Sequence, residues 1–435
     1  MKYSSISKLT TGIILIFLII AWHNGTSQQT LTIEQCFEDA RTNHPLRSKL
    51  DLTNQIATFN VENAKKQYLP KIDLTGQATY QSEVTLIPIE VPGFEVESLT
   101  RDQYKLSADI YQSIIDGGRV KSMVRIQEAS AQLENAQVEA DIYQVRQSVI
   151  NTYFGILKVE AQQQQLQKTI ETLEAQFKKV SAAVENGISL PGNKDALEAE
   201  ILNVQQSQIA LDHQKKMLVK NISTLTNKTI DASSTFNVPD FKNMQPGLNS
   251  INRPELRVLQ SGRQALQAKQ AMVDANVKPT LGAFVSAGYG KPGLNFLENA
   301  FSPYYVAGIR LKWNISQLYT KRNETEVNTL EAAKIQADEN QFLRNIQFVE
   351  DQFLTEIERL ETSNVQEEQI LVLRTKMRQR AEKQLENGVI TSADYITEVN
   401  HEQQVRISLE LRQLEINQLN YQLIHLYGFD SSKQN

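Results

Sequence analysis

The sequence predicts a mainly α-helical protein with a smaller β portion, built as two copies of one structural unit. Anchor residues recur at constant spacing, long stretches contain no proline and almost no glycine, and short segments alternate apolar with polar residues. The anchor pairs are Pro45 with Pro254 and Pro70 with Pro279, each 209 positions apart. An internal repeat of this length indicates a duplicated unit.

Residues 1–27 have the pattern of a secretory signal peptide, with Lys2 and Lys8 before an apolar core and small residues before Gln28. We therefore expect an exported mature chain, in which 43 basic and 50 acidic residues leave a net charge of −7. This acidic balance argues against nucleic acid as a partner. The single cysteine, Cys36, excludes an internal disulfide and is expected to be a buried thiol.

The first predicted repeat, 28–227, contains a long helix over 118–187 and a short helix over 193–227. The long helix has no proline and only Gly155 as an internal glycine. Its apolar residues follow steps of four and three, which is typical of coiled-coil packing. They are Leu166, Ile170, Leu173, Phe177, Val180 and Val184. The run Gln162–Gln165 is expected to lie mostly on the solvated side.

The second predicted repeat, 253–428, contains the corresponding long helix over 320–387 and short helix over 392–427. A shorter helix is expected before the strands of each repeat, starting near Pro45 and Pro254. The linker 228–252 is expected to form a small belt at mid-length, and 429–435 to be a tail.

Four segments alternate with period two, as half-buried strands do. They are 71–82, 103–115, 280–290 and 304–316. Aromatic residues fall near the predicted strand ends, where membrane-interface girdles lie. They are Tyr80, Tyr104, Tyr289, Tyr305 and Trp313. Because four strands leave unpaired edges, several chains must pool their strands in a membrane, and the sequence leaves two, three or four copies open.

Particular motifs accompany this order of elements. Tyr111–Arg119, with Gly117 and Gly118, stands where a strand bends into a long helix, and turns occur at Asn186–Ile188 and Asn387–Val389. With these motifs the whole mature chain resembles the TolC-type outer-membrane efflux protein family, the outer membrane factors. The second bend departs from the family pattern, because Tyr319-Thr320 stands in place of the glycine pair, and we expect a gentler bend there.

The resemblance implies a homotrimer with a 12-stranded β-barrel in the outer membrane and a long coiled-coil α-barrel tunnel in the periplasm. It also implies passive export from an inner-membrane pump, of the RND or ABC type, through a periplasmic adaptor (membrane fusion protein). The adaptor would dock on the tips formed by Gly187, Ile188, Gly388 and Val389. The alternative is that both glycines are only helix C-caps.

The resemblance places a periplasmic gate at Asp394, with Glu398 nearby and Asp195 as a weaker counterpart, displaced by the extra Leu190-Pro191. A ring of carboxylates attracts cations. The alternative is a helix start, because Thr391 and Asp394 have capping-box spacing.

Catalytic, cofactor-binding and metal-ligating constellations are absent from the sequence, so we expect no enzyme. The five histidines, His23, His44, His213, His401 and His425, lack metal-ligand spacing. The resemblance thus implies the outer-membrane channel of a tripartite efflux or type I secretion system, and leaves the substrate open. The rival interpretation is a periplasmic coiled-coil adaptor or scaffold, which would not need four strands with an apolar face.

Overall fold

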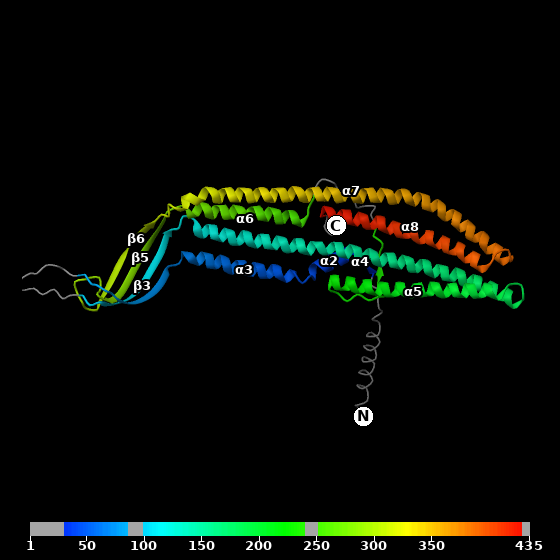
Figure 1. Ribbon diagram of the computed structural model, residues 1–435, viewed down its shortest axis with the longest axis horizontal. Helices are drawn as coiled ribbons and strands as arrows, with labels where there is room; N and C mark the ends of the chain where they lie inside the picture. The colour runs from blue at the N-terminus through cyan, green and yellow to red at the C-terminus, as the bar shows by residue number, and fades with distance from the viewer. Residues whose placement is uncertain (1–29, 86–98, 240–250, 429–435) are drawn as a thin grey trace, which may run out of the picture. The chain divides into compact units, whose positions relative to one another are not determined.

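The computed structural model describes residues 30–85, 99–239 and 251–428 (Figure 1). The predicted signal peptide and tail, and the middle of the linker, lie outside the described residues. The chain divides into two compact units: unit 1 takes residues up to 47, 141–253 and 344 onward, and unit 2 takes 48–140 and 254–343. These units do not coincide with the two sequence repeats, since each unit contains segments of both.

The sheet of unit 2 has four antiparallel strands in the order β2-β3-β5-β6. They are β2 (Lys71–Tyr80), β3 (Asp102–Ile115), β5 (Thr280–Lys291) and β6 (Ser302–Lys312). The two central strands come from different repeats, so the sheet joins the repeats through the β3–β5 ladder. The edge strands β2 and β6 each have one neighbour.

The register of the sheet brings the predicted apolar faces together. Gly76 lies opposite Leu106, which in turn lies opposite Tyr289, and Ile110 lies opposite Val285. Directly opposed residues share one face of a sheet, so the apolar sides of the strands form one surface. In a single copy this surface is uncovered: Leu74 is 76% exposed and Ile309 is 74% exposed.

The helices of unit 2 flank the strands in sequence. They are α3 (Arg47–Lys65), followed by the short 3₁₀ helix η1 (Lys66–Tyr68), α6 (Pro254–Asn276) and the first parts of α4 (Arg119–Glu185) and α7 (Gln317–Glu386). At the first bend Gly117 has φ +68°, and a Cβ there would lie 3.0 Å from the Cβ of Lys278. A side chain is therefore disfavoured by both conformation and space.

The second bend differs from the expectation. Because α7 already begins at Gln317, Tyr319 and Thr320 lie inside this helix rather than at the bend. The strand-to-helix connection is made by 313–316, where the backbone amide of Gln317 donates to the carbonyl of Asn314 and that of Leu318 to Ile315. A series of such i to i+3 bonds turns the chain without glycine.

Unit 1 contains α2 (Ile33–Thr42), α5 (Pro191–Thr226), α8 (Ser392–Tyr427) and the remaining parts of α4 and α7. Where a belt was expected, β1 (Thr30–Leu31) pairs in parallel with β4 (Thr235–Phe236). Cys36 is 1% exposed, as predicted, and burial together with Asp39 and Glu34 raises the pKa of its thiol to about 12. It packs in a core of α2, α4, α5 and α8 side chains, among them Tyr153 and Ile222.

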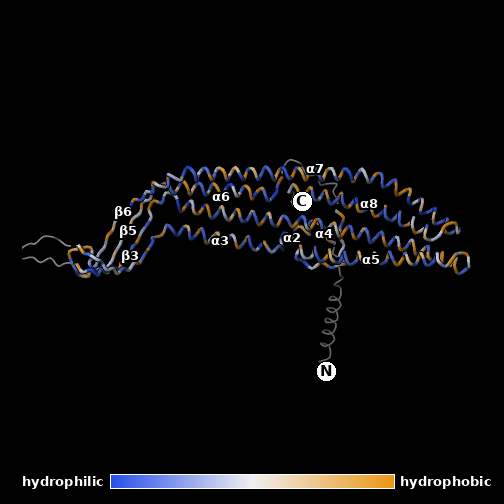
Figure 2. Tube along the Cα trace, in the orientation of Figure 1, coloured by the Kyte–Doolittle hydropathy of each residue, from blue (hydrophilic) through white to orange (hydrophobic). Residues whose placement is uncertain are grey.

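A second core of unit 1 lies toward the two turns. It contains four of the predicted seam residues of α4, with Phe177 and Val184 packed beside them. Apolar and polar residues alternate along these helices (Figure 2), which gives each helix one buried stripe. In the part of the chain that the structure describes, none of the helices has a stretch long and apolar enough to cross a membrane.

Candidate functional site

The two predicted docking tips are helix ends with the same backbone geometry. Gly187 has φ +72°, and its amide donates to the carbonyl of Val184 (2.9 Å) while that of Ile188 donates to Ala183 (2.7 Å). Gly388, with φ +68°, repeats this pattern. These are Schellman motifs, in which glycine at C′ takes the left-handed conformation. The capping role considered from the sequence is confirmed for both glycines.

The tips also present apolar side chains that the described residues of one copy leave exposed. Ile188 is 79% exposed, Leu190 76% and Val389 70%. A Cβ built on Gly187 or Gly388 meets no atom within 4 Å. Each turn is therefore an open apolar tip. Its left-handed backbone conformation favours glycine, although the surrounding space would admit a larger side chain.

Contacts within unit 1 hold the two turns at one level. The ammonium of Lys179 on α4 pairs with Glu386 (2.6 Å) and Glu382 (3.1 Å) on α7. On the other side, the backbone amide of Ser392 donates to Oδ1 of Asn193 (3.0 Å). Both hairpins thus reach the same end of unit 1.

The two turns have the same length, contrary to the sequence-based interpretation of Leu190-Pro191 as an insertion. In each hairpin the first helix ends two residues before the glycine, and the second begins four residues after it, at Pro191 and Ser392. Pro191 is simply the first helical residue of α5, a position that proline favours. Asp195 therefore lies two residues farther from its glycine than Asp394 does.

Asp394, the predicted gate residue, is the N3 residue of α8 and forms a capping box with the N-cap residue Thr391. Its Oδ2 accepts hydrogen bonds from the backbone amide (3.0 Å) and the hydroxyl (2.7 Å) of Thr391, and its own amide donates to the Thr391 hydroxyl (3.3 Å). These bonds from the Thr391 hydroxyl and amide hold the pKa of the Asp394 carboxyl below its ordinary value. The carboxylate is exposed and stays ionised at neutral pH.

The other two predicted gate residues have different surroundings. Glu398 lies 3.8 Å from the guanidinium of Arg374 and 4.0 Å from His401. Asp195 is exposed on α5. The structure thus brings Asp394, Glu398 and Asp195 to one end of unit 1, whereas Gly117 and Gly118 belong to unit 2.

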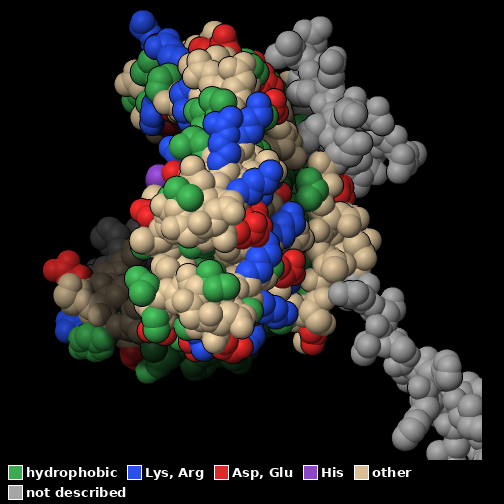
Figure 3. Space-filling model, turned by 90° about the vertical axis from the view of Figure 1, so that its right-hand side faces the viewer, with side chains coloured by type: hydrophobic (Ala, Val, Ile, Leu, Met, Phe, Trp, Pro, Cys, Tyr) green, Lys and Arg blue, Asp and Glu red, His purple; other side chains and the backbone are tan. Residues whose placement is uncertain are grey.

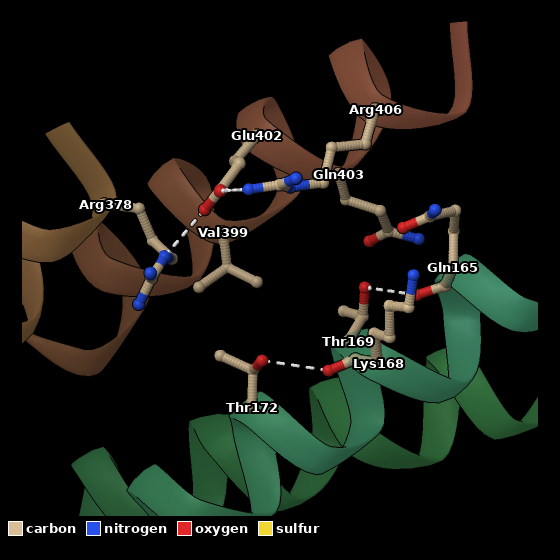
Figure 4. A pocket seen from close by; sticks show the side chains of 9 residues that line it. All are labelled: Gln165, Lys168, Thr169, Thr172, Arg378, Val399, Glu402, Gln403 and Arg406. Carbon is tan, nitrogen blue, oxygen red and sulfur yellow. Dashed lines mark hydrogen bonds and ion pairs between the residues drawn. The ribbon is translucent and has the colours of Figure 1, made fainter. Parts of the chain in front are cut away.

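A polar cavity of about 230 Å³ opens between α4, α7 and α8 near the second core (Figure 4). On its wall, Glu402 accepts from Arg378 (2.6 Å), Arg406 (2.6 Å) and the hydroxyl of Thr375 (2.8 Å). Burial opposes ionisation of Glu402, yet the hydrogen bonds from Arg406 and Thr375 outweigh it and lower the pKa of its carboxyl. This group joins α7 to α8 by charge-assisted hydrogen bonds.

Sequence reasoning missed this cavity. Gln165, from a run expected mostly on the solvated side, is 6% exposed, and its amide donates to Glu410 (2.7 Å). The signal available was the i, i+4 pair Glu402 and Arg406, which is common on solvated helix faces. Only the contact of Glu402 with Arg378, which comes from another helix, distinguishes this pair from a pair on a solvated helix face.

The arrangement of four antiparallel strands with long helices joined by equal turns defines the class of fold, which is similar to that of TolC-like outer-membrane channels. The structure of CusC, a transmembrane channel, is similar to this one with a TM-score of 0.68. The alignment covers 91% of each chain at 13% sequence identity. The Campylobacter jejuni outer membrane channel CmeC matches 91% of this chain and 85% of its own, at 12% identity and a TM-score of 0.64. The open state of the Neisseria gonorrhoeae channel MtrE gives 15% identity, 91% and 88% coverage and a TM-score of 0.65.

Residues 37–228 match the model of the outer membrane efflux protein family. The predicted resemblance is thereby confirmed, and so is the mainly α-helical TolC-like fold. The family is one of efflux channels and not a class of enzyme. Among curated protein sequences, none matches this chain significantly.

Proposed function

We propose that this protein is the outer-membrane channel of a tripartite efflux or type I secretion system. In this proposal a homotrimer conducts substrates passively from an inner-membrane pump and a periplasmic adaptor to the exterior. The observation that carries the proposal is the open sheet of unit 2. Among the described residues of one copy, its apolar face is uncovered and both of its edges lack a partner, so further strands and lipid must complete it.

Three copies of this sheet supply 12 strands, a number within the range of outer-membrane barrels. The open face suits lipid hydrocarbon, and the helices would form the tunnel in the periplasm. Export of the chain would depend on the predicted signal peptide. The rival function, a periplasmic adaptor or scaffold, is disfavoured because a soluble domain would cover Leu74, Ile309 and their neighbours.

The same proposal gives the turns and the nearby acids their functions. Gly187, Ile188, Gly388 and Val389 would receive the adaptor, because both tips are open and apolar. Asp394 would form the acidic ring of the periplasmic gate, with Glu398 one helical turn farther along α8. The Asp394 carboxylate can accept further hydrogen bonds besides those from Thr391. It can therefore belong to the capping box and to an acidic ring at the same time.

Conductance of the purified oligomer in a planar lipid bilayer tests the function. We expect stable, cation-preferring channels from the mature chain. A preparation that stays in solution without detergent and leaves bilayers unchanged would exclude the channel and favour the scaffold.

A further inference from the structure

The polar cavity of unit 1 lies where contacts between its two helical hairpins are interrupted. One wall of the cavity belongs to α4, and the other belongs to α7 and α8. At one end, Gln165 of α4 donates to Glu410 of α8 (2.7 Å), and toward the turns Lys179 of α4 pairs with Glu386 of α7 (2.6 Å). Between these two contacts, no hydrogen bond or ion pair among the described residues crosses from α4 to α7 or α8.

The wall formed by α4 is a row of buried polar residues. Gln165, Thr169, Thr172 and Gln176 follow one another by four, three and four positions, so they lie on one side of the helix. The hydroxyls of Thr169 and Thr172 donate to carbonyls of their own helix and do not reach the other wall. Gln176 is 2% exposed, and among the described residues neither atom of its amide has a hydrogen-bond partner. Because buried polar groups are costly when unpaired, this row indicates a polar occupant between the helices.

The carboxylate on the cavity wall, Glu402, is already saturated. One of its oxygens accepts from the Thr375 hydroxyl and from Nε and Nη2 of Arg406, and the other accepts from Nε of Arg378. A carboxylate offers about four acceptor sites, and these four donors occupy them.

Donors are in excess on both walls. Lys168 lines the cavity from α4, and Gln403 and Arg406 line it from α8 (Figure 4). Among the described residues, the side chains of Lys168 and Gln403 have no hydrogen-bond partner, and Arg406 uses only Nε and Nη2. The cavity thus combines three basic side chains, including Arg378, with one saturated carboxylate, so it lacks an acceptor with negative charge.

We propose that this cavity binds a small oxyanion, either a phosphate or a carboxylate group. Its oxygens accept from Lys168 on α4 and from Gln403 and Arg406 on α8, and such charge-assisted hydrogen bonds are the stronger kind. The volume of about 230 Å³ admits a group of this size together with water. The bound anion bridges the two hairpins where the protein itself supplies no polar contact. The site lies within one copy and does not depend on the proposed channel.

Isothermal titration calorimetry of the full-length protein in detergent tests the site. Sodium phosphate and sodium acetate are titrated separately, which distinguishes phosphate from carboxylate, and sodium chloride keeps the ionic strength constant. We expect saturable binding of at least one of these anions, with one anion per chain. Lys168→Met should weaken this binding about tenfold, and Gln403→Leu about threefold, because each removes a donor from a different wall.

A control variant separates the cavity from diffuse attraction of anions. Lys and Arg side chains gather on the end of unit 1 that carries the turns (Figure 3), and Lys376 is among the exposed residues there. Lys376→Met removes the same charge outside the cavity and should leave the affinity unchanged.

Three results would overturn the proposal. They are the absence of saturable binding of both anions, an equal loss of affinity in Lys168→Met and Lys376→Met, and unchanged affinity in Gln403→Leu. The conductance of the oligomer is measured separately, so each of these results leaves the proposed function standing. Failure of the conductance test would likewise leave the anion site standing.

Discussion

At the scale of single residues, Glu402 is a buried carboxylate of unit 1 that contacts two arginines. Its side chain is 8% exposed and accepts from two guanidinium groups on different helices. Removing one partner of such a group leaves buried charge uncompensated.

Glu402→Ala should therefore destabilise the α7–α8 pair by about 1–3 kcal/mol. Circular dichroism should show this as a lower Tm of the helical signal. Glu368→Ala, at an exposed position of α7, is the matched control and should change stability by less than about 0.5 kcal/mol. Equal effects of the two substitutions would mean that the Glu402 contacts add nothing to stability.

The carboxylate of Asp394 should confer cation preference on the proposed channel down to acidic pH. Its hydrogen bonds to Thr391 lower its folded pKa, so both its charge and its capping contribution are present above the unfolded value and are lost as pH falls through the folded value. Asp394→Asn should reduce the reversal potential under a salt gradient while keeping the helix start, since the N-cap Thr391 is unchanged and an amide oxygen at position 394 can still accept from the Thr391 backbone amide. An unchanged potential in the variant at neutral pH would place the gate elsewhere.

At the scale of elements, the two turns combine a strict backbone with open surroundings. Gly187→Trp or Gly388→Trp should cost roughly 1–2 kcal/mol for the left-handed conformation and should leave folding and membrane insertion intact. If the adaptor docks there, both variants should abolish export. Gly388→Asn is the control, because asparagine tolerates this conformation and adds little bulk. Full export in both tryptophan variants would reduce the glycines to their capping role.

The strand β2 allows an equally direct comparison of its two faces. Leu74→Arg should lower the outer-membrane yield, because arginine on a lipid-facing position costs roughly 2–4 kcal/mol at the bilayer midplane. Thr75→Arg carries the same side chain on the opposite face of the same strand and should insert nearly as well as the wild type. Membrane fractionation compares the yields, and equal yields would show that the assigned faces are wrong.

At the scale of the whole molecule, the unpaired edges of β2 and β6 require neighbours. We predict that the detergent-solubilised mature protein contains three copies, which light scattering with correction for bound detergent can measure. Chemical cross-linking of the same sample should stop at three. A stable monomer that conducts ions would contradict the prediction that strands of several copies must pair to close the barrel.

The sequence alone determined the properties that depend on neighbouring residues. The period of two in 71–82 predicted β2, and steps of four and three from Leu166 to Val184 predicted the buried seam of α4, because side-chain direction follows from local backbone geometry. Glycine at 187 and 388 marked the helix ends for the same local reason. The duplicated order of these signals then supported the family resemblance.

Only the tertiary structure decided which distant residues meet. The β3–β5 ladder joins residues about 180 positions apart, and Glu402 finds Arg378 across two helices; no periodicity encodes either partner. The tertiary structure also decided that α7 begins before Tyr319 and that Leu190-Pro191 is not an insertion. Helix starts depend on caps and packing, which a single sequence leaves ambiguous. Local periodicity specifies faces and elements, whereas partners depend on contacts that form when the whole chain folds.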